Sequence, residues 1–141
     1  MGRGAVSHKR SEFSMSEIDI LPGDLRDRSF SKNEIVLPCD DTLEAIRVLE
    51  ENGWAILSWE GWLRYPDGRV GHSPQFQGTV DILRDPEESW QSYVHRSAAF
   101  SRDTVSQANR EWGQASEESR AKLLFCISAW SKEQEESRNK K

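Results

Sequence analysis

The chain has 141 residues, with 24 acidic and 19 basic side chains and a formal net charge of -5. This length fits a single domain, since domains usually contain about 100–150 residues. The longest apolar runs contain only a few residues, as at Leu123–Ile127, whereas a membrane-spanning helix needs roughly 20. Because no basic cluster is present and the chain is acidic, a general nucleic-acid-binding protein is excluded together with a transmembrane protein.

The two ends of the chain are predicted to lie outside the folded domain. Residues 1–17 are polar and basic and lack the apolar stretch of a signal peptide, so we expect a disordered arm. Met15 is a second candidate start, in which case the preceding residues are vector-derived or upstream of the native start. The charged residues 135–141 are expected to fray. A single domain is therefore predicted over residues 18–134.

The first half of this domain is predicted to contain two short strands and a helix. Mild alternation of apolar and polar residues over 18–25 predicts a short strand or an extended arm. The apolar run at 34–37 predicts a second strand, which Pro38 ends. A helix is predicted over 41–52, because Asp40 and Asp41 supply capping oxygens and apolar residues follow at helical spacing.

The next two runs, 54–65 and 70–83, predict a β-hairpin around Pro66-Asp67-Gly68-Arg69. A three-residue loop pairs Tyr65 with Arg69, whereas a four-residue loop pairs Tyr65 with Val70. We prefer the four-residue loop because it separates apolar from polar side chains better. It places on one polar face Ser58, Glu60, Trp62, Arg64, Gln75, Gln77, Thr79 and Asp81. Glycines in both strands make bulges an expected feature.

Two further helices are predicted after the hairpin. The segment 85–88 has a capping aspartate, a proline at the first position and acidic residues against the helix dipole, and its helix is expected to end at Gly113. A last helix is expected to open at 116–118 with the inner stripe Leu123, Leu124, Ile127 and Trp130. Three tryptophans on helical stripes are expected in the core: Trp90, Trp112 and Trp130. The predicted fold class is α+β, a small antiparallel sheet built around a long β-hairpin and packed against about three helices.

The two cysteines give no indication of a metal site. Cys39 and Cys126 lack the neighbouring His or Cys residues of a zinc-binding pattern. Cys126 lies in an apolar run and is expected to be a small buried side chain. No cofactor is expected either, because glycine-rich nucleotide-binding loops are missing. Reduced thiols and no secretory signal predict a cytoplasmic protein.

The polar hairpin face is the predicted partner-binding site. Aromatic and arginine side chains ringed by polar groups are typical of interface hot spots. Glu60 lies between Trp59 and Trp62, and a carboxylate flanked by aromatic rings can bind a cation, a sugar or an arginine. The residues predicted to contact a partner are Glu60, Trp62, Arg64, Asp67, Gln75, Gln77 and Asp81.

His72 is the histidine with a candidate catalytic role, as an acid or base near Glu60 or Asp81. In the preferred register, His72 shares the face of Leu63, while Glu60 and Asp81 point the other way. A structural histidine is therefore the favoured interpretation. A small enzyme or ligand-binding domain with a pocket near Glu60, His72 and Asp81 stays an alternative.

The distribution of charge favours a protein-binding function. Residues 34–85 carry 10 acidic and 4 basic side chains, which sum to -6, while the flanking segments are nearly neutral. An acidic surface attracts a basic protein and accelerates the encounter. We therefore expect a non-enzymatic bacterial inhibitor of the immunity type, which neutralises a basic toxin or nuclease. A structural subunit of a homo-oligomer is a further alternative.

Overall fold

The computed structural model describes residues 16–72, 80–115 and 121–139, without the side chains at 72, 80, 81, 114, 115, 138 and 139. The first elements are a 3-10 helix η1 (Glu17–Ile20), a short helix α2 (Gly23–Asp27), a strand β1 (Ile35–Leu37) and a helix α3 (Cys39–Glu51). They are followed by strands β2 (Ala55–Arg64), β3 (Val70–His72) and β4 (Val80–Asp81), helix α4 (Trp90–Ala115), strand β5 (Lys122–Trp130) and helix α5 (Lys132–Asn139).

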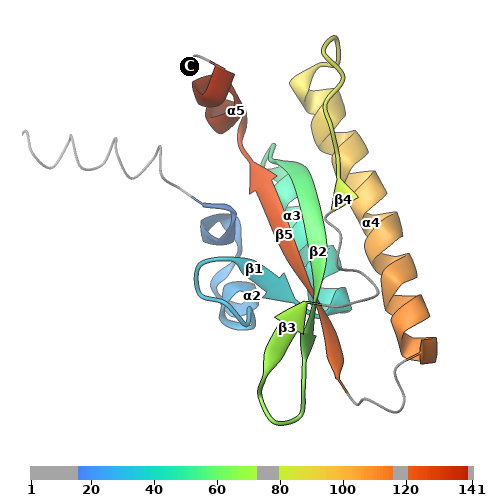
Figure 1. Cartoon of the computed structure of the whole chain (residues 1–141). Helices are drawn as coiled ribbons and strands as arrows, with labels where there is room; N and C mark the ends of the chain where they lie inside the picture. Colours follow the sequence, from blue (N-terminus) through green and yellow to red (C-terminus); the bar gives the residue numbers. More distant parts are fainter. Residues whose placement is uncertain (1–15, 73–79, 116–120, 140–141) are drawn as a thin grey trace, which may run out of the picture.

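These strands form one antiparallel sheet, so the predicted α+β class is confirmed (Figure 1). The strand order is β1-β5-β2-β3. Strand β4 pairs with the same edge of β2 as β3 does, but at Ser58 and Trp59 rather than at 62–64. Helices α3 and α4 contact each other and the two central strands β2 and β5. Their buried side chains form the main core together with one face of the sheet, which we call the inner face.

Two early predictions are confirmed and a third is wrong. Strand β1 and helix α3 lie where the sequence predicted them. The segment 18–25 forms parts of the two short helices η1 and α2, with an extended break at Leu21 and Pro22, rather than a strand. Ile18, Leu21 and Leu25 are buried in the main core, so packing against the core replaces strand pairing here. The backbone N–H of Ser16 donates to Asp19 Oδ2 at 3.2 Å, which caps η1.

The prediction of a last helix through residue 130 is wrong, because Lys122–Trp130 is the central strand β5. Alternate side chains of β5 enter the main core, namely Leu123, Phe125, Ile127 and Ala129. Leu124 and Cys126 are buried on the opposite face. A strand covered on both faces has a continuous apolar run instead of alternation, so periodicity alone could not distinguish it from a buried helix.

The preferred hairpin register is also wrong. Arg64 pairs with Val70 and Leu63 with Gly71, and the backbone N–H of Tyr65 donates to the carbonyl oxygen of Arg69 at 2.8 Å. This is the three-residue loop. Gly68 has a φ of 93°, the left-handed conformation that such a loop requires at its last position.

Helix α4 begins later than predicted and continues past Gly113 to Ala115. Ser89 is its capping residue, since the backbone N–H of Ser92 donates to Ser89 Oγ at 3.1 Å. The segment 85–88, expected to open the helix, forms a separate turn in which the N–H of Glu88 donates to the carbonyl of Asp85 at 2.9 Å. The acidic sequence therefore stabilises a turn rather than a helix terminus.

Helix α5 occupies much of the tail that was expected to fray. Ser131 and Gln134 form a reciprocal capping box, with N–H donation from Ser131 to Gln134 Oε1 at 3.0 Å and from Gln134 to Ser131 Oγ at 3.2 Å. The cap explains why a charged segment is helical here. The predicted arm reaches the described chain only at residues 16 and 17, and its other residues lie outside it.

The three tryptophans expected in the core are only partly buried. Trp54 and Trp59 are the more deeply buried ones, at 6% and 3% exposure. The indole of Trp90 donates to the carbonyl of Gly53 at 2.8 Å, and that of Trp112 donates to the carbonyl of Ala121 at 3.2 Å. Trp90 and Trp112 therefore attach the two ends of α4 to the segments beside the sheet.

Candidate functional site

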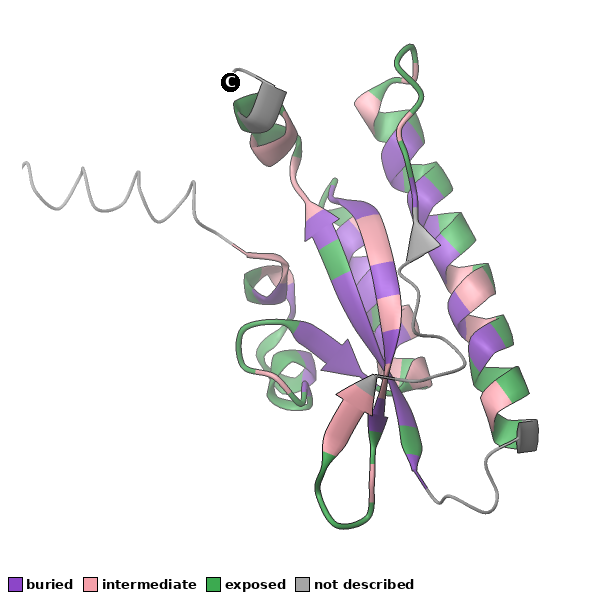
Figure 2. Cartoon of the chain, in the orientation of Figure 1, coloured by how far each residue is buried: buried purple, intermediate pink, exposed green. Residues whose placement is uncertain are grey.

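The face of the sheet opposite the main core, which we call the outer face, carries the central residues of the predicted binding site. Along β2, Trp59, Gly61 and Leu63 are buried, whereas Glu60 and Trp62 are partly exposed (Figure 2). Arg64 is exposed at the end of the strand. The alternation predicted for β2 is therefore present.

The outer face has a small apolar cluster of its own. Val36 of β1, together with Leu124 and Cys126 of β5, forms a buried cluster against which Trp62 packs. The strand register explains this contact, because Cys126 pairs with both Val36 and Glu60, and Leu124 pairs with Trp62. Strands β1 and β5 thus form one apolar surface on which the Trp62 side chain of β2 packs.

Carboxylates surround this cluster. Glu34 Oε2 lies 3.8 Å from Cys126 Sγ. Burial, and after it the charges of Glu34, Glu60 and Glu17, raise the pKa of the Cys126 thiol to about 12. Burial likewise raises the pKa of Glu17, with added repulsion from Glu34 and Asp19. These carboxylates lie close to Cys126, whereas Arg64 and the exposed Lys122 lie further along the same face. Cys126 is a protonated, unreactive thiol at neutral pH.

Two interactions fix the orientation of the exposed side chains. The indole Nε1 of Trp62 donates to Glu60 Oε1 at 3.2 Å, which holds this carboxylate beside the ring. The guanidinium carbon of Arg64 lies 5.2 Å from the centre of the Phe30 ring, a cation-π contact between the hairpin and the loop before β1. Phe30 remains 41% exposed. Neither Phe30 nor Glu34 was among the predicted site residues.

The remaining predicted site residues have different positions. Asp67 lies in the hairpin turn and bonds to the backbone and side chain of Arg69, at 3.0 and 2.7 Å. Asp81 pairs with Ser58, so its position belongs to the outer face, as predicted. Gln75 and Gln77 lie outside the described residues.

The predicted position of His72 is corrected by the register. His72 pairs with Trp62, so position 72 belongs to the outer face with Glu60 and not to the face of Leu63. Directly paired residues of antiparallel strands have side chains on the same side of the sheet. The side chains of His72 and Asp81 themselves lie outside the described part of the chain, so the alternative pocket at Glu60 stays a prediction.

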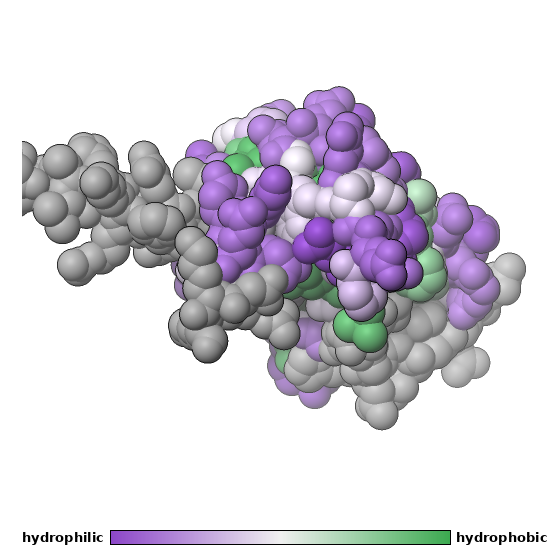
Figure 3. Space-filling view, turned by 90° about the horizontal axis from the view of Figure 1, so that it is seen from above, coloured by the Kyte–Doolittle hydropathy of each residue, from purple (hydrophilic) through white to green (hydrophobic). Residues whose placement is uncertain are grey.

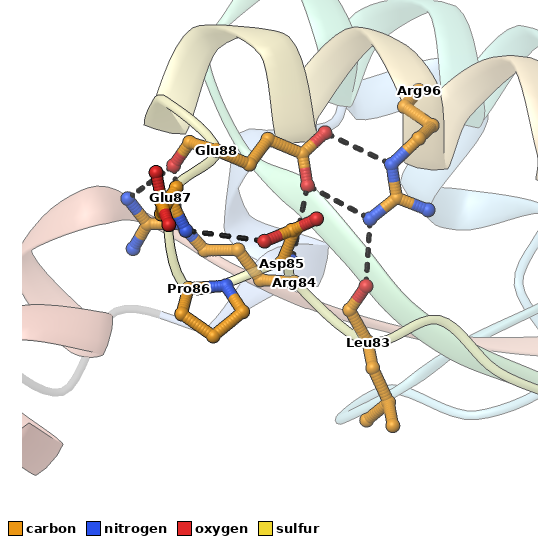
Figure 4. Close-up of a pocket in the computed structure, with 7 residues that line it drawn as sticks. All are labelled: Leu83, Arg84, Asp85, Pro86, Glu87, Glu88 and Arg96. Carbon is orange, nitrogen blue, oxygen red and sulfur yellow. Dashed lines mark hydrogen bonds and ion pairs between the residues drawn. The ribbon is translucent and has the colours of Figure 1, made fainter.

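A second surface feature, missed in the sequence, is the loop between β4 and α4. A depression here is lined by Leu83, Arg84, Asp85, Pro86, Glu87, Glu88 and Arg96 (Figure 4). Arg96 binds both carboxylate oxygens of Glu88 at 2.9 Å and the carbonyl of Leu83 at 2.6 Å. This pairing lowers the pKa of Glu88 to about 2, chiefly through the hydrogen bond from Arg96.

The end of the molecule that carries this loop and α5 is mainly hydrophilic. Seen from this end, small hydrophobic areas are separated by hydrophilic residues (Figure 3). Within residues 16–72, 80–115 and 121–139, no helix is long and apolar enough to cross a membrane. The same ranges contain no group of three His, Cys, Asp or Glu side chains arranged to hold a metal ion.

Comparisons with family models, with curated proteins and with solved structures find no match for this chain. The structure defines an α+β domain whose outer sheet face carries Glu60, Trp62 and Arg64.

Proposed function

We propose that the chain is a non-enzymatic protein-binding domain, a small acidic inhibitor of the immunity type that neutralises a basic toxin or nuclease. The observation that carries the proposal is the outer face, where Glu17, Glu34 and Glu60 surround one buried thiol beside Trp62. A partly exposed aromatic ring among charged groups is a typical anchor for a protein partner. The carboxylates select a basic partner and accelerate its encounter.

Internal pairing of other carboxylates also supports this assignment. On α3, Arg47 forms ion pairs with Glu44 and Glu51, and Glu50 pairs with Arg102 of α4 at 2.9 Å. The negative charges of these three glutamates of α3 are thus neutralised within the domain. Glu34 is exposed, and the described contact of its carboxylate is with Cys126. A partner's lysine or arginine therefore gains most by binding on the outer face.

The proposal includes a cytoplasmic location, which the two free cysteines support. Immunity proteins are encoded beside their toxins, so the products of the adjacent genes are the proteins to test. We expect a basic one among them to form a stoichiometric complex with this chain and to lose its toxic or nuclease activity. The affinity is expected to fall as salt is raised, because exposed charges are screened.

A pair of charge reversals tests the assigned face. Glu34→Lys places a positive charge on the outer face and is expected to weaken binding by about tenfold or more, since like charges across an interface are strongly unfavourable. Asp103→Lys makes the same change at an exposed position of α4 and is the control, expected to stay within about twofold of wild type. No complex with any adjacent basic product, or equal effects of the two variants, contradicts the proposal.

A further inference from the structure

Leu83 is the most exposed large hydrophobic side chain of the described residues. It is 80% exposed, although Ile82 beside it is only 5% exposed and belongs to the main core. Its side chain points away from the polar cluster that fixes the loop (Figure 4). A single exposed leucine is common on protein surfaces, so the remaining argument depends on how the loop is held.

The loop that presents Leu83 is fixed by two arginines. Arg96 of α4 binds the Leu83 carbonyl and the Glu88 carboxylate. The guanidinium of Arg84 donates twice to the carbonyl of Glu88, at 3.1 and 2.9 Å, and lies 5.6 Å from the Trp90 ring centre. These contacts use backbone oxygens and charged groups, and none of them uses the Leu83 side chain. The loop is therefore preorganised before any partner binds.

The charge around Leu83 indicates the chemistry of a partner. Both arginines are occupied by contacts inside the domain, and Arg84 also lies 4.0 Å from Glu135 of α5. Asp85 and Glu87 are exposed, and within the described part of the chain neither forms an ion pair. The rim of the leucine is thus acidic. An apolar pocket with a basic rim is the complementary surface.

We propose that Leu83 is a second anchor for the same basic protein partner, inserting into an apolar pocket of that partner while Asp85 and Glu87 contact its basic rim. This inference rests on the proposed function, because it names a further contact of the same complex. Because Arg96 and Arg84 already order the loop, binding loses less conformational entropy. Burial of one leucine at an interface centre corresponds to about tenfold or more in affinity.

Site-specific photo-crosslinking in the native host tests both proposals separately. A photoreactive phenylalanine is placed at Leu83, at Arg64 on the outer face, or at Phe100, which is 43% exposed on α4 and is the control. We expect positions 83 and 64 to crosslink to one and the same basic protein, and position 100 to give no product. Crosslinking at 64 without 83 overturns the Leu83 inference alone. No crosslink at any position overturns the proposed function as well.

The crosslinked protein, once purified, provides the quantitative test. Leu83→Ser keeps the backbone carbonyl that Arg96 binds, so the loop is retained, and unchanged thermal unfolding checks this. We expect Leu83→Ser to weaken binding about tenfold or more, while Phe100→Ser stays within about twofold. Arg96→Gln, which releases the loop, is expected to weaken binding in the wild-type background but not in the Leu83→Ser background. An affinity of Leu83→Ser equal to wild type overturns the inference.

Discussion

Two buried serines of α4, one helical turn apart, allow a matched test of how the helix is attached to the sheet. Ser97 and Ser101 are both 0% exposed. The Ser97 hydroxyl accepts the backbone N–H of Ile56 at 3.0 Å and donates to the carbonyl of Val94 at 3.0 Å. Among the described residues, Ser101 Oγ is the buried side-chain oxygen without a hydrogen-bond partner. The same substitution at the two sites therefore removes different interactions.

Ser97→Ala leaves the Ile56 N–H buried without an acceptor, which costs about 1–3 kcal/mol in the free energy of unfolding. Ser101→Ala loses no hydrogen bond and removes a buried polar group, so its free energy of unfolding is expected to be unchanged or to rise by up to about 1 kcal/mol. Urea unfolding followed by circular dichroism measures both, with the slope of the transition unchanged. Equal losses in the two variants, or a loss below about 0.5 kcal/mol for Ser97→Ala, would refute the reasoning.

Three further predictions concern charge and backbone conformation. Because the folded-state pKa of Glu17 is raised, its ionised form destabilises the fold at pH 7, so Glu17→Gln should stabilise the fold there. The gain should shrink as pH falls through the raised pKa towards the ordinary value of 4.5 and be absent below it, and a gain independent of pH argues against this. Because the pKa of Glu88 is lowered to about 2, the contact between Glu88 and Arg96 should persist as pH falls and be lost only near pH 2. NMR shifts of the Arg96 side chain that change near pH 4.5 would contradict this prediction. Gly68→Ala should lower the free energy of unfolding by about 1–2 kcal/mol because Gly68 has a positive φ. Gly71→Ala, where a Cβ meets nothing within 4 Å, should change thermal unfolding little, and equal effects of the two variants would count against the observed turn.

The parts of the fold that local chemistry determines could be predicted from the sequence. Strand β1 ends at a proline, and helix α3 has a clear apolar stripe. Asp40 and Asp41 lie in the first turn of α3 rather than capping it as predicted, because the helix begins at Cys39 with Pro38 as its N-cap. In β2, one face is buried against helices and the other is partly exposed, so polar and apolar residues alternate. Glu60, Trp62 and Arg64 share the less buried face, as the alternation predicted. These features depend on neighbours within a few residues.

The parts that depend on tertiary contacts could not be predicted. Strand β5 is apolar on both sides because α3 and α4 cover one face and Trp62 packs on the other, and neither contact is visible in its own sequence. The ring of Glu17, Glu34 and Glu60 requires three separate elements to meet at Cys126. The Leu83 loop depends on Arg96, which is 13 residues away in the chain. Long-range packing of this kind overrides local propensity.

The most direct test of the central claim uses the indole signals of the tryptophans in the presence of the basic partner. In a sample labelled with ¹⁵N-tryptophan, the Trp62 indole reports on the outer face, and the Trp59 indole, which donates to Thr104 Oγ1 at 2.8 Å, reports on the packing of α4 against the sheet. The account predicts that saturation with the partner shifts the Trp62 signal and leaves the Trp59 signal in place. A complex that forms with the Trp62 signal unchanged would contradict the assignment of the outer face as the binding surface.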